Sequence, residues 1–252
     1  MNDLTDGELL RYARQIMLPS IDYAGQQRLR AAHALVIGLG GLGSPVALYL
    51  AAAGVGRLTL IDDDRVDLSN LQRQIAHATP DIGSAKALSA AHRCTSINPH
   101  TTVETLTHRL SPQELRSRIA SVDAVLDCCD NFATRFAINE ACLAARRPLI
   151  SGAAIRWEGQ VAVFDARVAG SACYRCLYPD IDDVAETCTQ SGVIAPLTGV
   201  IGSLQATETL KLLAATGTTL AGRLLRYDAL RGQLRVSQLP RDPDCPSCNA
   251  LT

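Results

Sequence analysis

The chain has 252 residues, 47% of them hydrophobic, and its 24 basic and 25 acidic residues give a formal net charge of −1. This length fits one α/β domain with a sizeable core, and the balanced charge excludes the strongly basic surface of a nucleic-acid-binding protein. No apolar run is long enough to span a membrane, and the acidic start MNDLTDGELL lacks the apolar segment of a signal peptide. We therefore expect a cytoplasmic protein.

The chain opens with a predicted helix and then a strand–turn–helix–strand unit. A capping box at Thr5 and Glu8 begins a short helix that carries Arg11 and Arg14 on one face. An apolar strand then leads into a glycine-rich turn, an Ala/Leu-rich helix and a second strand that ends at Asp62. Such apolar strands and their connecting helix indicate a parallel sheet.

The later segments add both parallel and antiparallel strands. WEGQVAVFDA alternates between apolar and polar residues as an antiparallel strand does. We therefore predict an α/β fold: a Rossmann-like, mostly parallel sheet extended by antiparallel strands. The remaining expected elements are helices over about 68–77, 84–97, 111–120, 131–147 and 196–215, and strands over about 102–107, 123–130, 148–154, 157–166, and two within 222–240.

The turn GLGGLG has the spacing of a dinucleotide-binding fingerprint. Gly38, Gly40, Gly41 and Gly43 follow a strand and precede a helix, and Asp62 lies 22 residues after Gly40. Glycines let phosphate oxygens approach the backbone at a helix N-terminus, and the acid can accept ribose hydroxyls. The pattern favours a nucleotide site over a tight turn without a ligand, but it does not separate NAD from ATP.

If the nucleotide is ATP, its phosphates need cations from outside the glycine turn. Ser44-Pro45 stands where a Walker A loop has lysine followed by serine or threonine. The next polar segment offers Arg73 and Lys86, with Asn70 and Gln74 as neighbours. Taken alone, this segment fits a solvated surface equally well.

Asp130 follows a buried strand in DCCDN, at the edge of the sheet where ligands gather in this fold. A carboxylate there suits Mg²⁺ held against phosphate oxygens, and it could also cap the helix that begins at Asn131. An NAD-dependent oxidoreductase would need an acid/base group, usually histidine or lysine. None of the five histidines lies at the end of a later strand.

Seven segments, in order and over nearly the whole chain, resemble the bacterial sulfur-carrier adenylyltransferases of the ubiquitin-activating superfamily, the MoeB, ThiF and HesA group. The segments are RYARQI, GLGGLGSPVALYLAAAGVGRLTLID-D--V-LSNLQRQ, D-CDN---R, SGAAIRWEGQ, CYRCLYP, GVIAPLTGVIGSLQA-E--K and the terminal CPSC. Within this group the chain looks most like the molybdopterin-synthase adenylyltransferases, with the thiamine-pathway enzymes as the alternative.

The resemblance implies an activity. Such enzymes use ATP and Mg²⁺ to convert the C-terminal glycine of a small ubiquitin-fold carrier, which ends in Gly-Gly, into an acyl-adenylate with release of pyrophosphate. A sulfur donor later forms a thiocarboxylate, and because the chain ends soon after CPSC we expect that donor to be a separate protein. A non-enzymatic module that docks carriers is a third hypothesis.

The resemblance also implies site residues and an organisation. We divide one domain, 1–252, into a helical arm (1–30), a nucleotide-binding half (31–155) and a carrier-binding half (156–252). Arg14 resembles an arginine contributed across a homodimer interface, and the catalytic candidates are Arg14, Arg73, Lys86, Asp130 and Cys188. The candidate nucleotide contacts are Gly38, Gly40, Gly41, Gly43, Asp62, Asp64, Asn70, Arg73, Gln74, Lys86, Asp130 and Asn131.

Two C-x-x-C pairs, Cys173/Cys176 and Cys245/Cys248, supply the ligand set of a tetrahedral zinc site. The 68 residues between the pairs exceed the spacing of a compact zinc ribbon, so a redox dithiol stays possible for either pair alone. The resemblance implies that the two pairs share one zinc ion, Zn²⁺ bound by four thiolates, with a structural role.

The other five of the nine cysteines need separate explanations. Cys188 follows the acidic stretch DIDDVAE and lies outside any predicted core element. The resemblance implies a covalent link between such a cysteine and the carrier in some members and a dispensable thiol in others, and both alternatives stay open. Four cysteines fall in helix or strand patterns and are expected to be buried apolar residues: Cys94, Cys128, Cys129 and Cys142.

Overall fold

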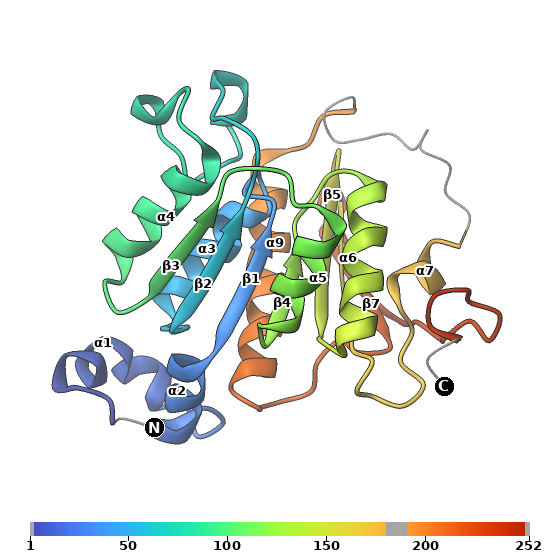
Figure 1. Cartoon of the computed structure of the whole chain (residues 1–252), viewed down its shortest axis with the longest axis horizontal. Coiled ribbons are helices and arrows are strands. Elements are labelled where there is room, and N and C mark those ends of the chain that lie inside the picture. The colour runs from blue at the N-terminus through green and yellow to red at the C-terminus, as the bar shows by residue number, and fades with distance from the viewer. Residues whose placement is uncertain (1–2, 180–190, 250–252) are drawn as a thin grey trace.

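A computed structural model of the protein describes residues 3–179 and 191–249. The described strands form one eight-stranded sheet in the order β3-β2-β1-β4-β5-β6-β7-β8 (Figure 1). Their bounds are β1 (His33–Ile37), β2 (Arg57–Ile61), β3 (Thr102–Leu106), β4 (Ala124–Asp127), β5 (Leu149–Ile155), β6 (Glu158–Phe164), β7 (Arg223–Asp228) and β8 (Gln233–Gln238).

The first five strands are parallel, and β6, β7 and β8 are added antiparallel at one side. The central parallel strands β1 and β4 are mostly apolar and buried because both faces of the sheet are covered there. In β1, Leu35 and Ile37 point into one core cluster while Val36 points into the other. The expected Rossmann-like sheet with antiparallel extension is confirmed.

Helices cover the sheet on both sides. In Figure 1, α5 and α6 lie in front of the sheet, and α3 and α9 lie behind it. Both predicted capping boxes are present, with Thr5 beginning α1 and Ser111 beginning α5. None of the helices in the described ranges is long and apolar enough to cross a membrane. The helices are α1 (Asp6–Ile16), α2 (Asp22–Ala31), α3 (Gly43–Ala52), α4 (Lys86–Ile97), α5 (Pro112–Ala120), α6 (Phe132–Ala145), α7 (Tyr174–Leu177) and α9 (Ala195–Leu213).

The helix expected over 68–77 is wrong. Only Leu68–Asn70 forms a short 3₁₀ turn, and Asp67 caps it by accepting a hydrogen bond from the Ser69 amide at 2.8 Å. Isolated turns and a second 3₁₀ turn at Thr79–Asp81 continue the chain as far as α4. Gln74 and His77 are both buried, because their side chains pack beneath the glycine turn, and this tertiary packing overrides the helical pattern.

Candidate functional site

A cleft of about 1340 Å³ opens at the carboxyl ends of the parallel strands and extends along the face of β6, β7 and β8. Most of the predicted nucleotide contacts line it together, although they come from four separate parts of the chain. Those that line it are Gly38, Gly40, Gly41, Asp62, Asp64, Arg73, Gln74, Lys86, Asp130 and Asn131. Gly43, Asn70 and Arg14 do not line it.

The glycine turn can form only because two of its residues lack a side chain. Gly38 has a φ of +89°, and a Cβ there would lie 2.8 Å from the Cys128 carbonyl oxygen. A Cβ on Gly43 would lie 1.8 Å from the Gly38 carbonyl oxygen. Gly43 is thus a packing requirement of the turn, whereas Gly40 and Gly41 form the floor of the cleft.

Asp62 holds the turn in place. Its Oδ2 accepts a hydrogen bond from the Leu39 amide at 2.6 Å, and its Oδ1 accepts one from the Asp64 amide at 2.9 Å. Burial raises the pKa of the Asp62 carboxyl, and these amide donors and Lys86 counteract part of that effect. Each oxygen keeps a free lone pair, so Asp62 can also accept ribose hydroxyls.

Lys86 and Arg73 place positive charge on one wall of the cleft. The Lys86 ammonium is nearly buried and lies 2.8 Å from an Asp64 carboxylate oxygen. Arg73 donates to the Ser69 carbonyl oxygen at 3.2 Å. Gln74, which also lines the cleft, is 4% exposed, and its Oε1 has no hydrogen-bond partner within the described residues. A buried acceptor without a donor on the wall of a cleft fits a site completed by a ligand.

Asp130 is not the helix cap that the sequence allowed. Asn131 is the N-cap of α6, and its side chain accepts the Thr134 amide at 2.9 Å. The Asp130 carboxylate is exposed at the mouth of the cleft. It is therefore available for Mg²⁺, which prefers carboxylate oxygens and phosphates as ligands.

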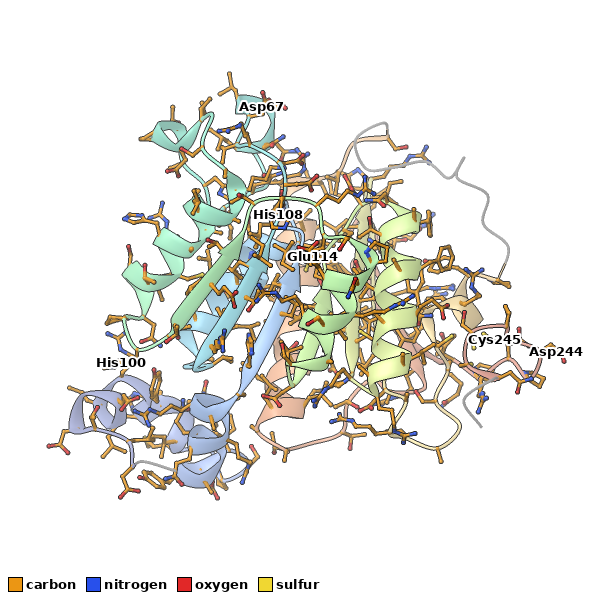
Figure 2. All side chains as sticks on the ribbon, viewed as in Figure 1. Asp67, His100, His108, Glu114, Asp244 and Cys245 are labelled. Atoms are coloured by element: carbon orange, nitrogen blue, oxygen red, sulfur yellow. The ribbon has the colours of Figure 1, made fainter. Side chains whose placement is uncertain are left out.

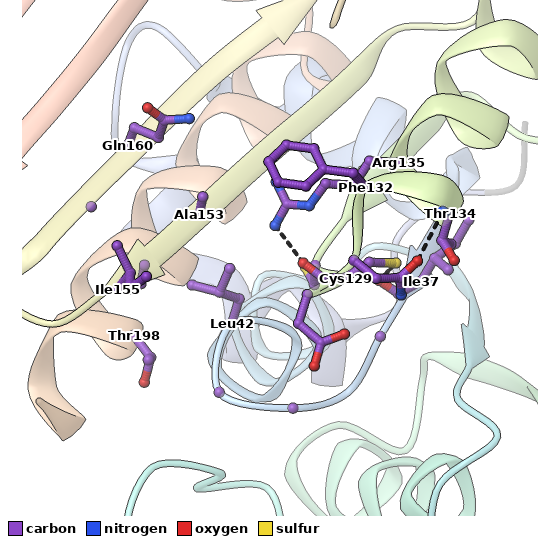
Figure 3. A pocket seen from close by; sticks show the side chains of 18 of the residues that line it. Ile37, Leu42, Cys129, Phe132, Thr134, Arg135, Ala153, Ile155, Gln160 and Thr198 are labelled. Carbon is purple, nitrogen blue, oxygen red and sulfur yellow. Dashed lines mark hydrogen bonds between the residues drawn. The ribbon is translucent and has the colours of Figure 1, made fainter. Parts of the chain in front are cut away.

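Arg135, the last residue of the D-CDN---R segment, has a structural role that its sequence pattern did not indicate. Arg135 is 7% exposed and donates to the Cys129 carbonyl oxygen (Figure 3). It also donates to the Gly152 carbonyl oxygen at 3.0 Å. Its guanidinium lies 3.7 Å from Asp127 and 3.5 Å from the Tyr174 hydroxyl. Arg135 thus holds the backbone next to Asp130 in position. A charged residue within the apolar pattern of α6 was the signal that could have revealed it.

The four thiols of the two C-x-x-C pairs lie within 4.8 Å of one another. Three of the Sγ–Sγ distances are 3.8, 3.6 and 3.5 Å, joining Cys173 to Cys176, Cys173 to Cys245 and Cys176 to Cys248. Zn–S bonds of about 2.3 Å place tetrahedral sulfurs about 3.8 Å apart, so the donor set fits zinc. Figure 2 shows Cys245 beside Asp244, away from the sheet.

The remaining cysteines match the expectation except at one position. Cys94, Cys128 and Cys142 are buried, whereas Cys129 is only half-buried and lines the cleft. Cys129 lies two residues after the end of β4 at Asp127, where the chain leaves the core. Burial and the Asp127 carboxylate raise the pKa of its thiol well above the usual value, so it is a poor nucleophile. Cys188 lies outside the described residues.

Comparison with known proteins identifies the family. Residues 12–247 match the ThiF family. The chain belongs to this family. Molybdopterin-synthase adenylyltransferase of Escherichia coli (strain K12) is 49% identical to this ThiF-family chain, over 98% of the chain and 99% of the relative. Sulfur carrier protein ThiS adenylyltransferase of the same organism is 46% identical over 97% of each.

The chain is also similar to a longer relative and to two solved structures. Adenylyltransferase and sulfurtransferase MOCS3 of Sus scrofa is 45% identical over 97% of this chain but 54% of its own length. Escherichia coli MccB in complex with MccA-N7isoAsn has a TM-score of 0.84 at 20% identity, covering 98% of this chain and 75% of that one. PaaA has a TM-score of 0.82 at 23% identity, covering 96% and 76%. These structures share the fold.

Proposed function

We propose that this ThiF-family protein uses ATP to adenylate the C-terminal glycine of a small ubiquitin-fold sulfur carrier. The observation that carries the proposal is the 49% identity, over nearly the full length of both chains, to an enzyme named molybdopterin-synthase adenylyltransferase. The carrier is then the small subunit of molybdopterin synthase. The thiamine-pathway carrier is the alternative, because the relative named for ThiS is almost as similar.

The cleft suits this chemistry. A carboxylate oxygen of the carrier attacks the α-phosphorus of ATP in line, a new P–O bond forms, and the bond to the β-phosphate oxygen breaks to release pyrophosphate. Arg73 and Lys86 would stabilise the negative charge on the phosphoryl oxygens and the leaving group. Mg²⁺ held by Asp130 would supply further charge stabilisation when bound.

No general base is needed, because a C-terminal carboxylate is already ionised at neutral pH. The nucleotide would occupy the half formed by residues 31–155. The carrier tail would enter along the face of β6, β7 and β8, in the half formed by residues 156–252, where the cleft continues. This arrangement brings the tail to the phosphates from the side opposite the glycine turn.

Exchange of labelled pyrophosphate into ATP tests the function. Exchange should depend on the carrier, and each Gly-Gly-ended ubiquitin-fold carrier of the host should be assayed in turn to identify the substrate. Absence of exchange with all of them would rule the proposal out. A calorimetric titration with ATP and with NAD separates the adenylyltransferase from an oxidoreductase, which should bind only the dinucleotide.

We also propose a homodimer in which Arg14 completes the partner's cleft. Arg14 is exposed on α1 and does not line the cleft of its own chain. Leu10 and Met17 flank it on the same helical face and are 81% and 70% exposed. A second exposed apolar area lies over α3 and α9 at Tyr49 and Val200. Exposed apolar areas of this kind mark subunit contacts.

Mixed dimers test this assignment. Arg14→Ala and Lys86→Ala should each nearly abolish pyrophosphate exchange. Mixing the two inactive variants under conditions that allow subunit exchange should restore about a quarter of wild-type activity, because half of the dimers then hold one intact site. If Arg14 acted within its own chain, no mixed dimer would be active.

The four-cysteine cluster would hold one structural Zn²⁺, because four thiolates leave no open coordination position. We place the protein in the cytoplasm, since its nine cysteines include this cluster and such thiols persist in a reducing compartment.

We propose that the Cys188 thiolate attacks the carbonyl carbon of the carrier acyl-adenylate, so that a thioester bond forms, the acyl–phosphate bond breaks and AMP leaves. Cys188→Ala should leave pyrophosphate exchange unchanged, because adenylation needs no thiol, and should abolish a carrier adduct seen by intact-protein mass spectrometry. Cys94→Ala, at a buried cysteine outside the cleft, is the control. An adduct that survives in Cys188→Ala would contradict the assignment.

A further inference from the structure

A buried histidine lies directly beneath the glycine turn. His77 is 6% exposed, and its Nε2 is 3.0 Å from the Leu39 carbonyl oxygen. Its Nδ1 is 2.9 Å from the Ser89 hydroxyl on α4. Because a carbonyl oxygen can only accept, Nε2 must carry the hydrogen, and neutral Nδ1 then accepts from the hydroxyl. Burial lowers the pKa of His77, and nearby Lys86 also lowers it, against the opposing effects of the Leu39 hydrogen bond, Asp62 and Asp81.

This contact fixes one residue of the turn from two directions. Asp62 accepts the Leu39 amide at 2.6 Å, and His77 donates to the Leu39 carbonyl oxygen. The carbonyl of Leu39 and the amide of Gly40 belong to one planar trans peptide and point in opposite directions. A carbonyl drawn down to His77 therefore turns the Gly40 amide away from the core. Within the described residues, the amides of Gly40 and Gly41 have no hydrogen-bond acceptor.

We propose that His77 is a positioning residue for ATP: by holding the Leu39 carbonyl, it aims the Gly40 amide at a phosphate oxygen. The identity of the ligand rests on the proposed function. The hydrogen bond to the phosphate is made by the backbone, and His77 supplies its orientation in advance. If the Gly40 amide were not already oriented, the turn would lose conformational entropy each time a nucleotide bound, and the affinity would be lower.

If His77 only filled space in the core, it would not need hydrogen bonds at both ring nitrogens. An apolar side chain of similar volume would pack the same space, but it would leave the Ser89 hydroxyl without its partner and the Leu39 carbonyl oxygen with only the longer contact, 3.4 Å, from the Ser44 hydroxyl. His33 offers a comparison within the same chain. It is half-buried at the other end of β1, where its Nε2 is 2.8 Å from the Thr59 hydroxyl, and it does not line the cleft.

The test compares His77→Leu, His77→Gln and the control His33→Leu in the full-length protein. His77→Leu should weaken ATP binding, measured by calorimetry without carrier, by roughly 10- to 100-fold, the effect of one hydrogen bond to a charged group. The KM for ATP should rise accordingly while the KM for the carrier stays unchanged. His77→Gln, which keeps a donor near the Nε2 position, should recover most of the affinity.

His33→Leu should lower the melting temperature without changing ATP affinity. The inference is overturned if His77→Leu binds ATP as the wild type does, or if the leucine variants of His77 and His33 weaken ATP binding equally. Should His77→Leu fail to fold, Ser89→Ala and His77→Gln provide the comparison, and unchanged ATP affinity in Ser89→Ala would count against the proposal. A wild-type protein that binds no ATP would instead overturn the proposed function.

Discussion

Replacing Asp130 with alanine should lower carrier-dependent pyrophosphate exchange by about 10²- to 10³-fold, the cost of removing one charged group that stabilises a transition state. Among the described residues this carboxylate makes no hydrogen bond or ion pair, and Asn131, not Asp130, caps α6. The substitution should therefore leave the melting temperature unchanged. Exchange should be measured across a range of Mg²⁺ concentrations, since a lost metal ligand raises the Mg²⁺ requirement.

Two further variants sharpen this experiment. Asp130→Asn keeps the shape but removes the charge, and it should be nearly as impaired as the alanine variant. Asp123→Asn changes an exposed aspartate at the opposite end of β4, where the side chain accepts the His33 amide at 2.9 Å. It should keep full exchange activity. Near-normal exchange in Asp130→Ala would exclude Asp130 from the reaction.

Of the substitutions considered, replacing Cys245 with serine should lower the melting temperature most. The metal would contribute its binding energy to folding, so losing one of four thiolates should remove bound zinc and lower the melting temperature by roughly 10 °C or more. The measurements are zinc content by elemental analysis and thermal unfolding with and without a chelator. ATP binding measured well below the melting temperature should be weakened less, because the cluster lies apart from the glycine turn.

Cys94→Ala is the matched control for a lost cysteine. Cys94 is fully buried in the core formed by α3 and α4 and is remote from the cluster. This variant should keep one zinc per chain and lose only the stability expected for a small buried side chain. Full zinc content in Cys245→Ser, or no response of the wild type to chelation, would contradict the zinc assignment.

The sequence predicted the central strands β1 and β4 because they are short apolar runs, and it predicted the starts of α1 and α5 because each begins at a capping box. The sequence also placed the glycine turn, Asp62 and Asp130 at one edge of the sheet, since all three follow parallel strands, and residues of all three line the cleft. It did not predict the roles of His77 and Arg135. Both act through backbone carbonyls, on Leu39 and Cys129, and no sequence pattern records which carbonyl a side chain reaches.

The helix prediction over 68–77 was wrong for a related reason. Its apolar spacing resembles a helix, but the buried Gln74 and His77 are used for contacts with the glycine turn. Asn70, expected at the nucleotide, instead donates to the neighbouring Ser69 hydroxyl at 3.4 Å. Long-range packing decided these positions, and local periodicity carries no information about it.

The position of the cysteine cluster affects the edge strand of the sheet, β8. In the described part of the chain, β8 pairs only with β7, so its other side presents free backbone donors and acceptors, and Leu234 and Val236 are about half exposed. Such an exposed edge strand can pair with a strand of another molecule. The cluster fixes the chain at Cys245, seven residues after β8 ends at Gln238. Loss of zinc would free that end, so the metal would protect the protein against aggregation as well as against unfolding.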